Sequence, residues 1–243
     1  MTRKSETKLT KYRILRSNAS LTKSLPRTRP FSRASFYSFI RRYSKVVAKP
    51  VSGSGGAGVI MISRATSGRY KVHRGAARKM IRGANRTFRY VRRRLVSRYL
   101  LQQGISLARV GGRPFDVRVM VQRRSGSGWS VTGMLAKVAG QGYMITNVRR
   151  SGGYVLPLST AIRRSTIRSA NSAAIIARLR RVALLAASRL SSYYTAQRVF
   201  GFDMGIDESG KVWIIEANLR PDITLFLKLK NKRMYRTILS YRR

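Results

Sequence analysis

Residues 201–218 read GFDMGIDESGKVWIIEAN. The segment Asp207 to Gly210 has the composition of a tight turn, and the flanking residues 202–206 and 211–217 are apolar and β-branched. Side chains alternate across a strand, so Glu216 and Asn218 share one face, with Asp203 beside them across the hairpin. The stretch therefore predicts an antiparallel hairpin with oxygen donors on one face.

Acidic residues are scarce and concentrated in this part of the chain. Of 243 residues, 52 are Lys or Arg and only 7 are Asp or Glu, and five of these seven acids lie between 203 and 222. Hard cations such as Mg²⁺ prefer oxygen ligands. We expect Asp203, Glu216 and Asn218 to bind a metal. The alternative is that the acids neutralise nearby arginines or form turns, which is our interpretation of Asp207 and Glu208.

Composition limits the class of protein. The net charge of +45 excludes an ordinary acidic or neutral metabolic enzyme, and 43% apolar residues exclude a disordered basic tail. With no cysteine and the single histidine His73, disulfides, thiolate metal sites and a catalytic triad are disfavoured. The charge favours polyanionic partners, bound non-specifically at low salt.

The N-terminus and the apolar runs bear on localisation. No apolar segment follows the charged N-terminus, and every apolar run is shorter than the roughly 18 residues of a membrane span, so we expect no membrane span and an intracellular protein. The Arg- and Ser-rich residues 1–45 would also suit an organelle transit peptide, which is the less favoured alternative.

A glycine-rich loop, residues 51–58, lies between predicted strands at 45–50 and 59–62. Gly53, Gly55 and Gly58 match G-x-G-x-x-G, but a dinucleotide fold requires a helix after the loop, and here a strand follows. Gly-Lys-Ser/Thr, His-Arg-Asp and Asp-Phe-Gly motifs are absent from the sequence. The loop is therefore interpreted as a hairpin whose amides close over phosphates, with Lys49 meeting their charge, or else as a plain β-hairpin.

The remaining segments predict a mixed α+β chain. We expect helices at 32–43 and 172–194, strands at 70–73, 99–105, 116–122, 129–139 and 143–148, a helix or solvated strand over 77–100, a basic turn at 149–153 and a basic amphipathic tail at 225–243. Asp116 and Arg118 share a strand face, which indicates an internal ion pair or a role in substrate binding.

The order of these motifs resembles the ATP-grasp superfamily and, within it, the YheC/YheD-type endospore coat-associated proteins of bacilli. The resemblance is carried by residues 25–28, 49–59, 102–118, 129–153 and 201–221. It implies an α+β ATP-grasp fold in which two α+β lobes clasp the nucleotide, as one module over 1–243. Its parts would be an N-terminal segment (1–43), a nucleotide lid lobe (44–104) and a C-terminal lobe with the metal and substrate site (105–243).

The resemblance also implies a role for individual residues. Phosphates would be bound by Lys49, by a lid containing Ser52, Gly53, Ser54, Gly55 and Gly56, and by an N-terminal lysine, Lys8 or Lys11. Adenine would pair near Gln102, Gln103 and Ile105, and Mg²⁺ would bind Asp203, Glu216 and Asn218. The acyl phosphate and the substrate would face Arg118, Asn147, Arg149 and Arg150.

The implied activity is an ATP- and Mg²⁺-dependent carboxylate–amine ligase acting through an acyl phosphate, with an acidic peptide or a spore coat protein as substrate, in the cytoplasm or the spore coat. The extra N-terminal domain of many ATP-grasp enzymes is expected to be absent, so that a substrate-binding surface would be missing or supplied by a partner. One alternative is an inactive ATP-grasp protein with a structural role in the spore coat. Another is a basic nucleic-acid-binding protein that uses Arg92 to Arg94, Tyr90 and Tyr99.

Overall fold

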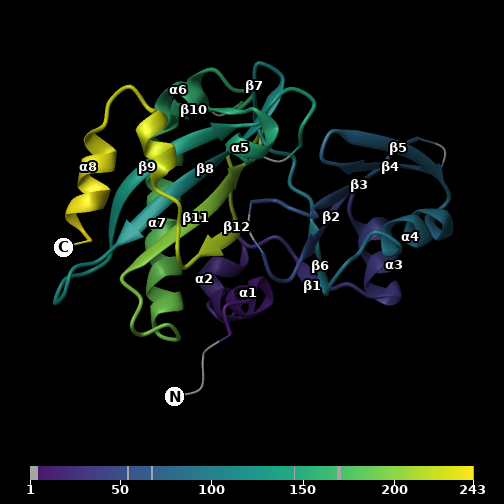
Figure 1. Ribbon diagram of the computed structural model, residues 1–243, viewed down its shortest axis with the longest axis horizontal. Helices are drawn as coiled ribbons and strands as arrows, with labels where there is room; N and C mark the ends of the chain where they lie inside the picture. Colours follow the sequence, from purple (N-terminus) through teal and green to yellow (C-terminus); the bar gives the residue numbers. More distant parts are fainter. Residues whose placement is uncertain (1–4, 54, 67, 145, 169–170, 243) are drawn as a thin grey trace.

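Two antiparallel sheets with helices packed against them form the protein (Figure 1). The computed structural model describes residues 5–53, 55–66, 68–144, 146–168 and 171–242, with only the backbone of Arg149. The predicted α+β class is confirmed. In the described part of the chain, no helix combines the length and the apolar character that crossing a membrane requires.

The N-terminal sheet has the strand order β1-β6-β2-β3-β4-β5. Its strands are β1 (Thr28–Pro30), β2 (Lys45–Pro50), β3 (Ile60–Arg64), β4 (Arg69–Arg74), β5 (Ala77–Arg82) and β6 (Tyr99–Gln103). Helices α3 (Arg33–Arg42) and α4 (Ala84–Arg92) cover one face, where Phe36 and Val91 pack on Ile60. The uncovered face, which carries Val47, Lys49, Met61 and Gln102, is called the open face below.

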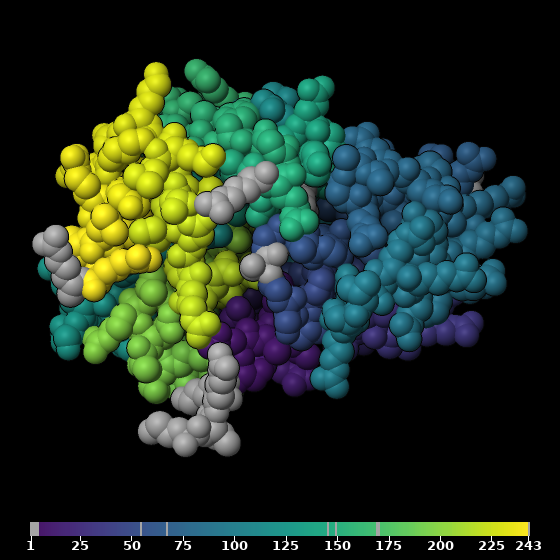
Figure 2. Space-filling model, in the orientation of Figure 1, coloured from purple at the N-terminus to yellow at the C-terminus, as the bar shows by residue number. Residues whose placement is uncertain are grey.

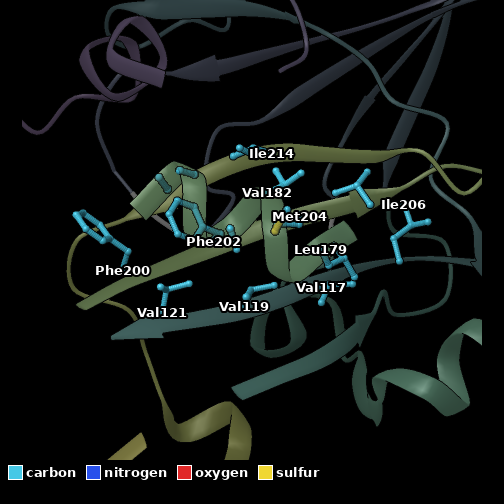
Figure 3. Packing of buried hydrophobic residues seen from close by; sticks show 14 of the residues in the cluster. Val117, Val119, Val121, Leu179, Val182, Phe200, Phe202, Met204, Ile206 and Ile214 are labelled. Atoms are coloured by element: carbon cyan, nitrogen blue, oxygen red, sulfur yellow. The ribbon is translucent and has the colours of Figure 1, made fainter. Parts of the chain in front are cut away.

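The C-terminal sheet has the order β10-β9-β8-β11-β12, with β7 paired to β8. Its strands are β7 (Arg109–Val110), β8 (Arg113–Gln122), β9 (Ser130–Val138), β10 (Tyr154–Pro157), β11 (Val199–Ile206) and β12 (Val212–Asn218). On one face α7 (Ser172–Ser191) packs Leu179 and Val182 against the apolar side chains of β8 and β11 (Figure 3). Burying this many large side chains is the main stabilising contribution to the C-terminal part.

Shorter helices complete both faces of the C-terminal sheet. Helices α1 (Lys8–Arg16) and α2 (Ala19–Thr22) lie on the α7 side. The 3₁₀ helix η1 (Thr224–Lys228) and α8 (Arg233–Ser240) cover the other face, where Phe226 and Ile238 contact Met120 and Leu135. Helices α5 (Val148–Ser151) and α6 (Leu158–Arg163) flank β10. The segment 1–43 is thus shared: α1 packs on α7, whereas β1 belongs to the N-terminal sheet.

Most predicted elements are present, and one strand prediction is wrong. The hairpin at 201–218 forms with its turn at 207–210, and the segment 77–100 divides into β5 and α4. The predicted strand at 143–148 is not formed by the described residues of that range. There the Asn147 side chain accepts a hydrogen bond from the Arg150 amide and starts α5, which ends at Gly152 with φ +64°. Helix capping therefore prevails over the apolar and β-branched composition at the start of this segment.

Candidate functional site

A cleft of about 460 Å³ lies between the open face and the C-terminal sheet. One wall is formed by β2, β3 and β6. The opposite wall carries charged and polar side chains of β8, β9, β11 and β12, namely Asp116, Arg118, Lys137, Asp203, Glu216 and Asn218. A cavity of about 30 Å³ adjoins it and contacts Lys8, Lys11 and Lys49. The fold therefore gathers most of the predicted site residues around one space.

Lys49 links the two walls of this cleft. Its Nζ atom donates to Gln102 Oε1 at 2.9 Å and, across the cleft, to the Ile215 carbonyl at 3.1 Å. Burial lowers the pKa of Lys49 to about 8, although the Glu216 carboxylate partly offsets that effect. Both hydrogen-bond acceptors found for this buried ammonium in the described part of the chain are neutral, which suits an incoming anion.

Of the two candidate N-terminal lysines, Lys8 reaches the glycine loop. Its Nζ atom donates to the Gly53 carbonyl and lies 3.5 Å from Glu216 Oε1. Lys11 is buried beside the small cavity, and burial lowers its pKa. The geometry therefore places Lys8 nearer than Lys11 to the loop expected to cover phosphates.

Four charges, three of them buried and that of Asp203 half-buried, alternate in sign along the opposite wall. Arg118 donates to both carboxylate oxygens of Asp203, at 2.9 and 3.3 Å. Lys137 Nζ lies 2.7 Å from Asp203 Oδ1 and 3.2 Å from Asp116 Oδ1. The Thr146 hydroxyl donates to Asp116 Oδ2. Asp116 and Arg118 therefore do not form the ion pair with each other that one interpretation expected, because each pairs with a residue on another strand.

The two carboxylates of this network have opposite pKa shifts. Burial raises the pKa of Asp116 to about 6, because the attraction of Lys137 offsets it only in part and Asp203 adds repulsion. Burial acts the same way on Asp203, but Arg118 and Lys137 together outweigh it and hold its pKa well below the usual range. Asp203 is thus firmly ionised, whereas Asp116 titrates near neutral pH.

The three predicted metal donors lie together. The strand register places Asp203 directly opposite Glu216 in the hairpin. Asn218 Nδ2 donates a hydrogen bond to Asp203 Oδ2 at 3.4 Å. Among the described residues, no group of three or more His, Cys, Asp or Glu side chains could hold a metal ion. Two carboxylates and an amide still fit Mg²⁺ when phosphate oxygens and water complete its shell. The donor set therefore fits a metal that arrives with a nucleotide.

The glycine loop approaches the C-terminal part at its tip. Gly55 and Gly56 line the cleft, and a β-carbon on Gly55 would lie 3.5 Å from Asn147 Nδ2. Ser52 is exposed and, like Gly53, does not line the cleft. The predicted residue Ser54 and the side chain of Arg149 lie outside the described residues. Arg150 is exposed and does not line the cleft.

The expected adenine segment forms one end of the cleft. Gln102, Gln103 and Ile105 line it, together with the apolar side chains of Val47 and Met61. The amides of Gln103 and Gly104 already donate to the Arg27 and Lys45 carbonyls, at 2.8 and 2.9 Å. This partly apolar region of the cleft is called the slot below, and two backbone donors of the segment are already in use.

Two residues of the site were missed by sequence reasoning. Lys137 was a detectable candidate, because it is the only charge in the apolar strand segment 134–138. Thr146 gave no signal, since its contact with Asp116 joins residues 30 positions apart. Arg220, Pro221 and Asp222 also line the cleft, just beyond the last predicted metal donor.

Comparison with known proteins identifies a matching family and a curated relative. A family model of YheC/D-like ATP-grasp proteins matches residues 2–242. The endospore coat-associated protein YheD of Bacillus subtilis strain 168 is 30% identical over 190 residues, which are 76% of this chain and 41% of YheD. The chain thus spans about two fifths of the length of this curated relative.

Solved structures share the fold at low sequence identity. The L-amino acid ligase of Bacillus licheniformis has a TM-score of 0.53 at 13% identity, covering 88% of this chain and 40% of that one. N5-carboxyaminoimidazole synthetase from Staphylococcus aureus complexed with ADP has a TM-score of 0.56 at 11% identity, covering 97% and 51%. The predicted ATP-grasp fold is confirmed.

Proposed function

The chain belongs to the YheC/D-like ATP-grasp family, and on that premise we propose that it is an ATP- and Mg²⁺-dependent ligase that joins a carboxylate to an amine. The observation that carries the proposal is the cleft, which sets the buried Lys49 opposite the carboxylates of Asp203 and Glu216. We further propose an acidic peptide or a spore coat protein as substrate, in the cytoplasm or the spore coat, where the name of YheD places that relative.

We assign the nucleotide to the wall formed by β2, β3 and β6. Lys49, Lys8 and the glycine loop, through Gly55 and Gly56, would bind its phosphates, and the slot at Gln102, Gln103 and Ile105 would hold adenine. In these terms 44–104 is the lid lobe and 105–243 the C-terminal lobe, with 1–43 as the N-terminal segment. Asp203, Glu216 and Asn218 would hold Mg²⁺, which neutralises charge on the transferring phosphoryl group.

The proposed reaction has two steps. A carboxylate oxygen of the substrate attacks the γ-phosphorus of ATP and ADP leaves, giving an acyl phosphate. The amine nitrogen then attacks the acyl carbon, phosphate leaves and the nitrogen loses a proton. We assign the orientation of these anions to Arg118, which lines the cleft beside Asp203, and to Asn147, which lies near the loop tip. Arg149 and Arg150 follow Asn147 in α5. Positioning and charge neutralisation provide most of such catalysis.

A specific observation also favours a second candidate, an ATP-grasp protein with a structural role in the spore coat and no turnover. Asp203 is already neutralised by Arg118 and Lys137, so its carboxylate has two strong partners before any metal binds. Breaking such buried pairs is costly unless an anion replaces the carboxylate. An active enzyme requires this exchange when nucleotide phosphates enter, whereas a structural protein does not.

Trapping of the acyl phosphate distinguishes the two candidates. The protein is incubated with ATP, Mg²⁺, hydroxylamine and a glutamate-rich peptide, and hydroxamate and phosphate are measured. The ligase forms both in equal amounts, and Glu216→Gln abolishes them. Glu208→Gln is the matched control, because Glu208 lies in the turn of the same hairpin, outside the cleft lining. ATP binding without hydroxamate, for a broad set of carboxylates, would contradict the ligase and favour the structural protein.

A further inference from the structure

The open face of the N-terminal sheet continues beyond the cleft as a basic surface. Strand register places Lys45, Ser63, Lys71 and Met80 in one row across β2 to β5. A parallel row runs Val47, Met61, His73 and Arg78, and it begins at residues that line the cleft. The strands β4 and β5 lie at the end of the molecule opposite α8 (Figures 1 and 2).

Like charges face one another on this surface. Arg69 on β4 is directly opposite Arg82 on β5, and both side chains are exposed. Between Glu6 and Asp116 the sequence has no acidic residue, so no acid of the N-terminal sheet or of its covering helices neutralises them. Directly opposed like charges destabilise a sheet. A bound anion would remove that repulsion.

The arrangement of the cations favours an extended polypeptide as this anion. Arg69 and Lys71 are exposed and lie two residues apart on one face of β4, so their spacing is about 6.6 Å, which is also the spacing of alternate side chains in an extended chain. Met80, 50% exposed, adds an apolar contact between the cations.

Nucleic-acid binding by base stacking is less well supported. Tyr99 is only 4% exposed, and Arg94 and Lys79 lie over the Tyr90 ring, at 3.4 and 5.3 Å. Tyr99 is therefore not accessible to a base, and two cations already contact the Tyr90 ring.

The basic surface leads towards the site. Arg78 donates to the Gly142 carbonyl at 3.0 Å, two residues before Met144, which lines the cleft. His73, paired with Arg78 across the hairpin, is buried, and Met61 separates it from Val47 in the cleft. A chain lying on the exposed cations could therefore continue past this contact to the loop at 140–147.

We propose that the basic surface formed by Arg69, Lys71, Arg78 and Arg82 docks an extended acidic polypeptide. The docking itself is independent of turnover. Only the further statement, that the docked chain is the carboxylate substrate of the cleft, rests on the proposed function.

Matched charge variants of the full-length protein test this docking. The probe is a fluorescent peptide of alternating glutamate and serine, with binding followed by anisotropy at moderate salt. Arg69→Gln, Lys71→Gln and Arg82→Gln are combined in one variant. The control variant combines Arg86→Gln, Arg89→Gln and Arg93→Gln, which removes the same charge from exposed positions at α4, on the covered face. We expect the first variant to bind the peptide about tenfold more weakly than the wild type, because three surface ion pairs with the peptide are lost. The control variant should bind the peptide nearly as tightly as the wild type.

The outcomes separate docking from net charge and from nucleotide binding. Equal losses in both variants would overturn the proposal, since binding would then follow net charge alone. A single-stranded oligonucleotide of equal charge that binds more tightly than the peptide, and depends on the same three residues, would also overturn it. ADP affinity is measured in parallel and is expected to be unchanged in both variants. A wild type that binds the peptide but not ADP would refute the proposed function and leave the docking surface supported.

Discussion

Replacing Asp116 with Asn is expected to stabilise the protein more at pH 8 than at pH 5. Asp116 is buried beside Lys137 and Thr146, and its pKa is about 6, compared with an ordinary value of 3.8. A carboxyl whose folded pKa is raised binds more protons in the folded state, so the free energy of unfolding falls as pH rises from about 4 to about 6. Asn keeps the shape and has no charge to desolvate, so the variant lacks this loss.

The expected size follows from the two pKa values. The difference between about 6 and 3.8, at about 1.4 kcal/mol per pH unit, gives about 3 kcal/mol in total. About half of it develops below pH 5, which leaves about 1.4 kcal/mol between pH 5 and pH 8. Urea denaturation at both pH values and constant ionic strength measures the gap between variant and wild type. The gap should shift by that amount in favour of the variant at pH 8.

Asp207→Asn is the control for this experiment. Burial opposes ionisation of Asp207, but hydrogen bonds from Ser209, Trp213 and Lys211 outweigh it and lower its pKa. Asp207 is therefore ionised in both folded and unfolded chains from pH 5 to pH 8, and its gap should be constant. A constant gap for Asp116→Asn, or one that shifts against the variant at pH 8, would refute the assigned burial of the Asp116 charge.

Two further predictions concern packing and nucleotide binding. Gly140→Ala should lower the free energy of unfolding by about 3 kcal/mol, because its β-carbon would lie 1.5 Å from the Ser151 carbonyl oxygen. Gly128→Ala is the control, because a β-carbon there meets nothing within 4 Å. Thermal denaturation compares the two variants, and equal stability would contradict the close packing of Gly140. ADP affinity should fall as pH rises above about 8, because Lys49 then loses its proton. Lys49→Gln should bind ADP weakly and without this pH dependence. Calorimetry below and above about pH 8 tests this, and the same fall in ADP affinity with pH in the variant would exclude Lys49 as the cause.

The local part of the fold was predictable because short-range patterns determine it. The hairpin at 201–218 follows from alternation and a four-residue turn, and α7 follows from an apolar stripe of helical spacing. The segment 143–148 begins with apolar and β-branched residues typical of a strand, but the Asn147 cap and the close packing of Gly140 on Ser151 determine its conformation. Such contacts depend on the tertiary structure, so the local sequence predicts them poorly.

The site was predictable where its residues share a strand pair. Asp203 and Glu216 face each other because the hairpin register places them so. The ion pairs of Asp203 with Arg118 and Lys137 join residues that are 85 and 66 positions apart in the sequence. A short-range sequence pattern does not predict which basic side chain pairs with which carboxylate over such separations. The choice between Lys8 and Lys11 likewise depended on how α1 meets the glycine loop.

Calorimetric titration of ATP with and without Mg²⁺, at high salt, tests the central claim most directly. High salt suppresses the general attraction of anions to a chain of charge +45, and polyphosphate is titrated as the anion control. We predict Mg²⁺-dependent ATP binding that Glu216→Gln abolishes and Glu208→Gln preserves. Equal binding of ATP and polyphosphate that salt removes, unchanged in Glu216→Gln, would contradict a working nucleotide site in this cleft.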